Sequence, residues 1–200
     1  MNVEFLFDLG SPNAYFAHRA IPGIEARTGV KFRYVPMLLG GVFKATNNKS
    51  PVVQFAGIKN KLEYERLEID RFIRKHGLSK FHWNNNFPVN TLTIMRGAVA
   101  AGELGVGAPY IEAMFRGMWE DSLKLDDPAI IAETLNRAGL DGAAILAKTQ
   151  DQAVKDRLLA NTENAVARGT FGAPTFFVGD EIYFGKDRLR DVEDAIVAAK

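Results

Sequence analysis

The sequence predicts an α/β fold in which a long helical segment interrupts a small β-sheet. Residues 1–36 read as strand, helix and strand, and residues 170–200 read as strand, strand and helix. Between them, apolar residues recur with helical spacing over residues 37–169. We therefore expect one α/β unit formed by residues 1–36 and 170–200, with residues 37–169 inserted as an all-helical domain.

The opening segment contains a strand that leads directly into a helix. Residues 3–7 form a short apolar run, and Ser11 and Pro12 are residue types favoured at the cap and first position of a helix. The helix is expected over residues 11–28, and a second strand over residues 31–35. A strand–helix–strand unit of this kind pairs its strands in parallel through a right-handed crossover.

The closing segment is expected to form a hairpin followed by a helix. Residues 175–178 and 181–184 are β-type runs separated by two turn residues, Gly179 and Asp180. Asp187 is then expected to cap a last helix, whose apolar residues fall on one face: Leu189, Val192 and Ile196. The order β-α-β followed by β-β-α is that of the thioredoxin fold.

The middle of the chain contains several amphipathic helical patterns and no strand pattern. An irregular segment rich in turn residues interrupts them at residues 81–90. The expected helices cover residues 62–73, 91–102, 108–120, 128–138, 142–148 and 151–168.

Composition excludes several classes of function. The 25 basic and 24 acidic residues nearly cancel, so no field favours nucleic acid or an anionic membrane. With no cysteine, the chain forms no disulfide, thiolate metal site or protein-based thiol redox couple. We find no pattern typical of a metal site, a nucleotide-binding loop, a signal peptide or a transmembrane helix, and we expect a cytoplasmic protein.

Ser11 is the first candidate functional residue. A strand that delivers a serine to a helix N-terminus places a hydroxyl among free N–H groups, at the positive end of the helix dipole. Thioredoxin-like proteins carry their redox Cys-x-x-Cys at this point, and here the residues read Ser11-Pro12-Asn13-Ala14. An anion can bind there, although a serine in this position can also serve only as a helix cap.

Pro174 is the second candidate, because it stands just before the hairpin. In a thioredoxin-like fold this loop faces the helix that Ser11 starts. We expect a cis peptide bond before Pro174, with the backbone of Ala173 directed at a peptide ligand that pairs with it as a strand would. The alternative is an ordinary trans proline at a sheet edge.

Three motifs occur in order at thioredoxin spacing: Phe7-Asp8-x-x-Ser11-Pro12, Gly172-Ala173-Pro174-Thr175 and Phe184-Gly185-Lys186-Asp187-Arg188. With Asn47-Asn48-Lys49-Ser50-Pro51 and Lys61-Leu62-Glu63-Tyr64 in the helical middle, the chain resembles the kappa-class glutathione transferase family along nearly its whole length. Within that family it is most similar to the 2-hydroxychromene-2-carboxylate isomerases.

The resemblance implies that glutathione is a catalytic cofactor. Ser11 would lie against its sulfur and Ala173, before Pro174, would pair with its cysteinyl backbone. Four further residues would complete the site: Lys186 and Asp187 at the γ-glutamyl end, with Asn48 and Lys61 closing the pocket from the helical domain. Kappa transferases usually have serine where Lys186 stands. Lys61 can also be read as a solvated helix residue, and Asn48 as a loop residue with local bonds.

The reaction that the resemblance implies is an isomerisation in naphthalene-type aromatic catabolism. The glutathione thiolate adds transiently to 2-hydroxychromene-2-carboxylate, a small aromatic carboxylate, and leaves after ring opening and bond rotation to give trans-o-hydroxybenzylidenepyruvate. Two alternatives stay open: a kappa-class transferase that keeps the adduct, and a non-catalytic thioredoxin-like binding module. A homodimer is implied by the family alone.

Two other readings receive less support from the sequence. A Ser-His-Asp hydrolase is disfavoured because His18 lies seven residues beyond Ser11, about 10 Å along the helix axis. Aromatic residues near Ser11 and in the turn-rich segment are expected in the core rather than on a substrate-binding surface. These residues are Tyr15, Phe16 and Trp83.

Overall fold

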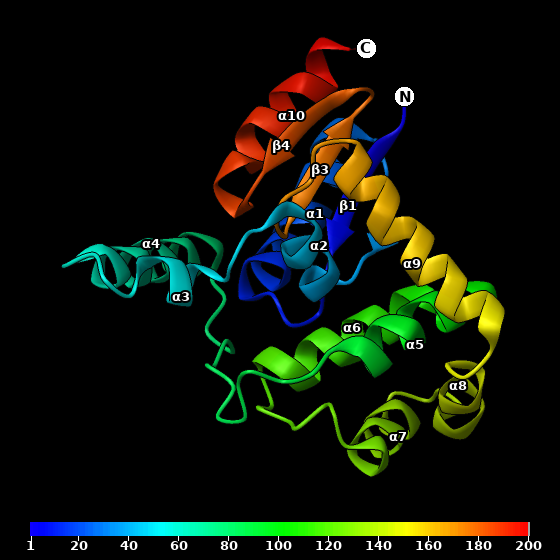
Figure 1. Ribbon diagram of the computed structural model, residues 1–200. Helices are drawn as coiled ribbons and strands as arrows, with labels where there is room; N and C mark the ends of the chain where they lie inside the picture. Colours follow the sequence, from blue (N-terminus) through cyan, green and yellow to red (C-terminus); the bar gives the residue numbers. More distant parts are fainter. Residues whose placement is uncertain (200) are drawn as a thin grey trace.

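The computed structural model describes residues 1–199, and it has the predicted thioredoxin-like sheet (Figure 1). The strands are β1 (Val3–Phe7), β2 (Arg33–Pro36), β3 (Thr175–Val178) and β4 (Glu181–Phe184). Their order is β2-β1-β3-β4, with β1 parallel to β2 and both other pairs antiparallel. The first strand of the chain therefore pairs with a strand from its last residues.

Most of the predicted helices are present within two or three residues of their expected ends. In Figure 1, α3 and α4 project from the body as an arm, while α5 to α8 lie below the sheet. The helices are α1 (Pro12–Thr28), α2 (Leu39–Thr46), α3 (Pro51–Phe55), α4 (Lys61–His76), α5 (Leu92–Glu103), α6 (Gly107–Trp119), α7 (Pro128–Arg137), α8 (Gly142–Lys148), α9 (Gln152–Ala167) and α10 (Leu189–Ala198).

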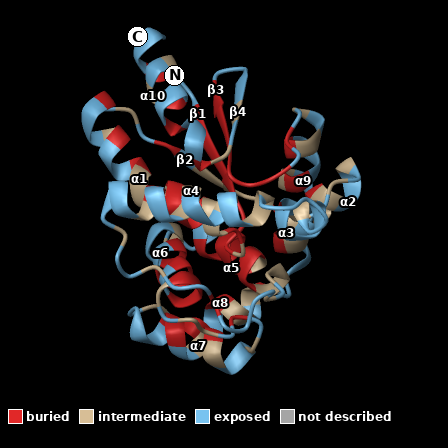
Figure 2. Ribbon diagram, turned by 90° about the vertical axis from the view of Figure 1, so that its left-hand side faces the viewer, coloured by how far each residue is buried: buried red, intermediate tan, exposed pale blue. Residues whose placement is uncertain are grey.

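The sheet and the helical insertion share one hydrophobic core, coloured as buried at the centre of Figure 2. Every residue of β1 is buried, and the ring of Phe5 stacks on Phe176 of β3 at 5.4 Å between centroids. Phe7 continues this core toward Phe115 of α6, at 5.8 Å. The helical segment thus buries its apolar face against the sheet. The division of the chain into two domains at residues 36 and 170 stays a prediction from the sequence.

The ends of α1 follow the local signals in the sequence. The Ser11 hydroxyl accepts a hydrogen bond from the Ala14 amide at 3.2 Å, and Pro12 occupies the first helical position. At the other end Gly29 adopts a left-handed conformation, with φ of 67°, and donates its N–H to Glu25. Both ends of the helix that presents Ser11 are therefore fixed.

Two predictions at element ends are wrong. Strand β2 begins at Arg33 rather than at residue 31, because Glu25 binds the Lys31 ammonium and the Phe32 amide and so draws both toward α1. Asp187 does not cap the closing helix. It lies in a 3-10 turn before α10, and its carboxylate instead accepts a hydrogen bond from the Lys186 ammonium at 2.6 Å.

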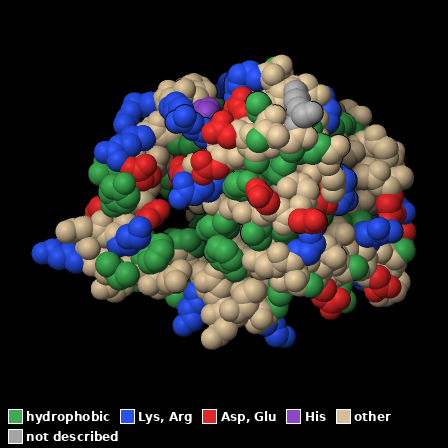
Figure 3. Space-filling view, turned by 90° about the horizontal axis from the view of Figure 1, so that it is seen from above, with side chains coloured by type: hydrophobic (Ala, Val, Ile, Leu, Met, Phe, Trp, Pro, Cys, Tyr) green, Lys and Arg blue, Asp and Glu red, His purple; other side chains and the backbone are tan. Residues whose placement is uncertain are grey.

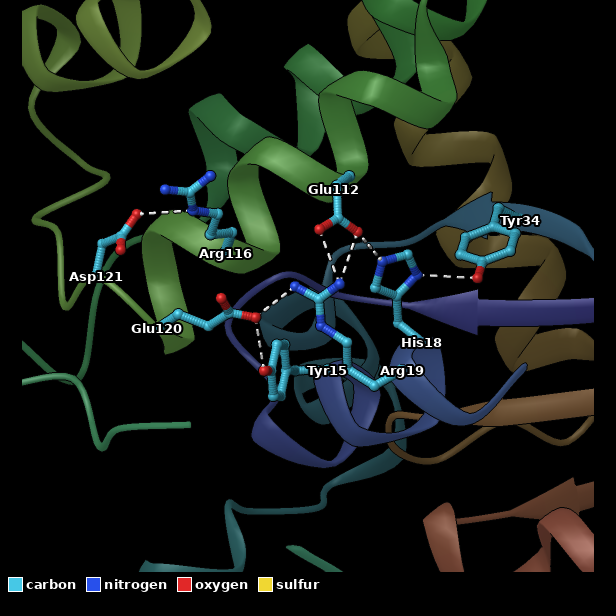
Figure 4. A network of polar contacts seen from close by, with 8 residues as sticks. All are labelled: Tyr15, His18, Arg19, Tyr34, Glu112, Arg116, Glu120 and Asp121. Carbon is cyan, nitrogen blue, oxygen red and sulfur yellow. Dashed lines mark hydrogen bonds and ion pairs between the residues drawn. The ribbon is translucent and has the colours of Figure 1, made fainter. Parts of the chain in front are cut away.

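A polar network joins α1 to α6 and to β2 (Figure 4). Arg19 binds Glu112 at 2.8 Å and Glu120 at 2.5 Å, and the two ring nitrogens of His18 contact Glu112 and the Tyr34 hydroxyl. His18 therefore serves in this network and makes no contact with Ser11.

This network predicts a specific loss of stability in acid. Hydrogen bonds from His18 and Arg19 lower the pKa of Glu112 to about 2 from an ordinary 4.5. Because the folded-state pKa is depressed, the stabilisation is complete above about pH 5 and is lost as the pH falls toward 2. Glu112→Gln should destabilise the protein at pH 7 by on the order of 1 kcal/mol, a value reduced for solvent screening. Its free energy of unfolding should then change less with pH below about pH 5 than that of the parent.

Urea unfolding followed by circular dichroism between pH 2.5 and 7 measures this effect, and Glu133→Gln on the exposed face of α7 is the matched control. If the free energies of unfolding of Glu112→Gln and the parent differed by the same amount at every pH in that range, Glu112 would not be the group responsible for the loss of stability in acid.

Candidate functional site

Ser11 stands at the turn between β1 and α1, and its side chain is buried. Besides accepting from Ala14, its hydroxyl donates a hydrogen bond to the carbonyl oxygen of Ala173 at 3.2 Å. This bond joins residues 162 positions apart and confirms that the loop before β3 faces the start of α1.

The loop that carries Ala173 is held from both sides. The Ala173–Pro174 peptide bond is cis, as the sequence indicates. The Thr175 hydroxyl donates to the Gly172 carbonyl at 2.8 Å, and the Gly185 amide donates to the Pro174 carbonyl at 2.9 Å. A side chain at Gly172 would approach the Phe184 ring to 2.7 Å, so a larger residue here would have to displace that ring.

Asp8 organises the surroundings of Ser11, a role that sequence reasoning missed. Its buried carboxylate accepts from the amides of Gly10 and Leu39, both at 2.8 Å, and from the Thr91 hydroxyl at 3.1 Å. Burial raises the pKa of Asp8 above its ordinary value, against these hydrogen bonds. One side chain thus ties the Ser11 turn to the starts of α2 and α5.

The predicted site residues Asn48, Lys186 and Asp187 have different surroundings. The Asn48 side-chain amide donates to the carbonyl of Phe171 at 2.8 Å, which places it against the Ala173 loop. Lys186 is buried, with its ammonium 5.1 Å from the centre of the Phe72 ring, while the neighbouring Asp187 is exposed. The structure therefore brings Asn48 to the loop and holds Lys186 against α4.

Lys61 lies at the start of α4, on the projecting arm. Its ammonium binds Glu65 on the same helix and lies 5.0 Å from the centre of the Phe55 ring. No hydrogen bond or ion pair among residues 1–199 joins it to Ser11 or Ala173. Figure 3 shows a hollow between the arm and the body, with lysine and arginine side chains at its rim, so the arm faces open space.

Aromatic side chains flank the turn that carries Ser11. Trp119 donates its indole N–H to the Leu9 carbonyl at 2.9 Å and lies edge-on to Trp83 at 6.4 Å. Trp83 is 50% exposed, so its expected place in the core is wrong, whereas Tyr15 and Phe16 are buried as predicted. Of these rings, Trp83 is the one that is open to solvent, and the buried Trp119 links it to the turn.

A sequence profile of the DSBA-like thioredoxin domain matches residues 2–197. The chain belongs to this family. It is 28% identical to the 2-hydroxychromene-2-carboxylate isomerase of Pseudomonas putida, over 98% of this chain and 94% of that protein. It is 26% identical to glutathione S-transferase kappa 2 of Caenorhabditis elegans, over 96% of this chain and 90% of the relative.

A solved 2-hydroxychromene-2-carboxylate isomerase has a similar fold. It superposes with a TM-score of 0.82 at 28% identity, covering 100% of this DSBA-like chain and 96% of that one. None of the helices within residues 1–199 has both the length and the apolarity that a membrane crossing requires. In the same range, no three histidine or acidic side chains gather as metal ligands would.

Within residues 1–199, two residues near Ser11 and Ala173 in the sequence have a buried side-chain oxygen that makes no hydrogen bond. The side-chain oxygen of Asn13 and the hydroxyl of Thr170 are buried without a hydrogen-bond partner. Asn13 also lies in the first turn of α1, where a backbone N–H has no helical acceptor. Asn13 is two residues from Ser11 and Thr170 is three residues from Ala173, so both lie close in sequence to the Ser11–Ala173 contact.

Proposed function

We propose that this protein is a glutathione-dependent isomerase that converts 2-hydroxychromene-2-carboxylate to trans-o-hydroxybenzylidenepyruvate. The observation that carries the proposal is the Ser11 hydroxyl facing the Ala173 carbonyl at the N-terminus of α1, in a chain without cysteine. The isomerases similar to this chain over nearly its full length support the isomerisation, and the kappa transferases support glutathione as the cofactor. A cytoplasmic location and a homodimer belong to this proposal.

The residues that would hold glutathione lie on both sides of the loop before β3. Ser11 and the first turn of α1 would face the sulfur, and the backbone of Ala173, before Pro174, would pair with the cysteinyl unit. Further polar contacts would come from Asn48, Lys61, Lys186 and Asp187. When bound, glutathione supplies a thiolate nucleophile, which its free thiol, with a pKa near 8.5, scarcely provides at neutral pH.

Ser11 would stabilise that negative charge. Its single O–H is donated to the Ala173 carbonyl in the structure, and rotation about the Cβ–Oγ bond redirects it toward a ligand. The Ala14 amide keeps the oxygen in place, since the cap hydrogen bond does not use the hydroxyl proton. A hydrogen bond to a charged sulfur, added to the dipole of α1, favours the ionised thiol.

Mass balance of glutathione tests the proposal against its alternatives. With 2-hydroxychromene-2-carboxylate and substoichiometric glutathione, an isomerase turns over many equivalents and returns all the glutathione. A kappa-class transferase, which the 26% identity to a nematode kappa enzyme supports, consumes one glutathione for each product. A binding module takes up glutathione and gives no turnover, and either of these two results would overturn the proposal.

Lys61 provides a second test, because it lies on the arm and away from Ser11. If its ammonium binds the anionic ligand, Lys61→Ala should raise the KM for glutathione or substrate by about tenfold, with a smaller change in kcat. Initial rates at low ionic strength measure this, with the exposed neighbour Lys59→Ala as the matched control. Kinetics equal to the parent's would make Lys61 a surface residue.

A further inference from the structure

A second hollow, of about 740 Å³, lies along the outer edge of the sheet and contains none of the residues assigned to the glutathione site. Its walls come from α1, β2, α5, α6 and α9. Along α1 it extends from His18 to Glu25, seven to fourteen residues beyond Ser11, which is roughly 10–20 Å along the helix axis.

The edge of β2 offers backbone groups to this hollow. The Met37 amide donates to Phe7 of β1. In a parallel pair every second residue directs both backbone groups at the neighbouring strand, so the backbone groups of residues 33 and 35 face β1 and those of residues 32, 34 and 36 face outward. The outward N–H of Phe32 is bound by the Glu25 carboxylate at 2.9 Å, and the outward carbonyl of Pro36 by Asn161 at 3.0 Å.

Between these two hydrogen bonds, the N–H and carbonyl of Tyr34 point away from β1 at the wall of the hollow, and within residues 1–199 β1 is the one strand that pairs with β2. The Tyr34 hydroxyl is bound to the ring of His18, so the Tyr34 side chain does not occupy these two backbone groups (Figure 4). A strand of another chain cannot pair along this edge, because the backbone groups on either side of Tyr34 are already hydrogen-bonded. A small ligand with one polar group can still bind to the N–H or carbonyl of Tyr34.

The charges around the hollow leave one cation without a partner. Among the charged side chains that line it, Arg33 binds Glu4, Glu25 binds Lys31 at 2.6 Å, and Glu103 binds Lys148 at 3.0 Å. Arg157 of α9 makes no ion pair within the described chain. The rest of the wall is largely apolar and includes Ile21, Phe32, Val35, Ala98, Val99 and Ile111.

We propose that this hollow binds a small monocarboxylate with an apolar body. The carboxylate would accept hydrogen bonds from the Arg157 guanidinium and the Tyr34 amide, and the body would lie against the apolar wall. A volume of about 740 Å³ accommodates a ligand of one or two rings. This site is separate from Ser11 and stands whether or not the protein is an isomerase.

The test uses 2-naphthoate as the probe and the backbone amides of the ¹⁵N-labelled protein as the readout. We expect saturable shifts at the Tyr34 and Val35 amides, and roughly tenfold weaker binding of the neutral 2-naphthamide, which lacks the charge. Arg157→Gln should weaken naphthoate binding at these amides by about tenfold, while Arg190→Gln, an exposed arginine on α10, should not.

Two variants distinguish the hollow from the Ser11 site. Ala108→Trp, at an exposed position on the wall, should fill the hollow and abolish the shifts without disturbing the core. Ser11→Ala should leave them unchanged. Shifts confined to residues around Ser11, or shifts at Tyr34 that survive both Arg157→Gln and Ala108→Trp, would overturn the proposal.

Discussion

Ser11→Ala is expected to lower turnover near neutral pH by about ten- to a hundred-fold. Under the proposed function it removes one hydrogen bond to a charged sulfur, worth roughly 1.5–3 kcal/mol. The pKa of the bound thiol should then rise by about one to two units, because each unit corresponds to 1.36 kcal/mol. Activity should recover in part as the pH rises, since the thiolate then forms without the serine.

The direct measurement is the ultraviolet absorbance of the thiolate, titrated in the glutathione complexes of both proteins. Ser11→Cys should retain more activity than the alanine variant, because a thiol is still a weak donor. Ser50→Ala is the matched control, since Ser50 also precedes a helix and makes no capping hydrogen bond. An unchanged thiol pKa together with unchanged turnover would reduce Ser11 to a helix cap.

Loss of the Ser11 cap itself costs only about 1 kcal/mol, so the fold should persist in these variants. Thermal unfolding of Ser11→Ala in the absence of glutathione separates the two effects. A large drop in Tm would assign the lost activity to the fold, whereas the expected small drop assigns it to the chemistry.

Gly97→Ala is expected to have the largest effect on stability. Gly97 lies in α5 against the ring of Tyr110 on α6, and an added Cβ would come within 2.7 Å of the ring carbon that bears the hydroxyl. Tyr110 is fully buried and donates to the Ile94 carbonyl at 2.8 Å, so it cannot move aside. We expect a loss of about 3 kcal/mol and a fall in Tm of about 6–12 °C.

The control for this substitution is in the same helix. Gly102→Ala places its Cβ in open space, so better helix propensity should raise stability by about 0.5–1 kcal/mol. Adding Tyr110→Phe to Gly97→Ala removes the closest atom and should recover part of the loss. Equal effects of the two glycine substitutions would show that α5 and α6 are not packed as described.

The elements that the sequence predicted well are those with local signals at their ends. The capping pair Ser11-Pro12 defines the start of α1, and the two-residue turn at 179–180 defines the hairpin. Helices α2 and α3 were not assigned individually. Helix α2 has eight residues and contains two adjacent glycines, and α3 has five residues and buries none of them, so neither is long enough to show the helical periodicity on which a prediction depends.

Errors arose where the backbone conformation of a neighbouring residue, or a contact distant in sequence, decides the outcome. Asp187 has the residue type of a helix cap, but Gly185, with φ of 94°, turns the chain so that α10 starts two residues later. Asp8 receives a hydrogen bond from a residue 83 positions away, and no local pattern predicts that partner. The meeting of Ser11 with Ala173 was predictable only because the order of strands fixed the topology.

The central position of β3 has a consequence for how the protein is made. The β1 segment is synthesised well before its antiparallel partner, which spans residues 175–178. Until residues 175–178 have been made, β1 is an apolar strand with one open edge, a state that favours aggregation. Closing this long-range pair is also a slow folding step. Ser11 meets Ala173 only when β3 has formed, so activity should appear only in chains that already include residues 175–184.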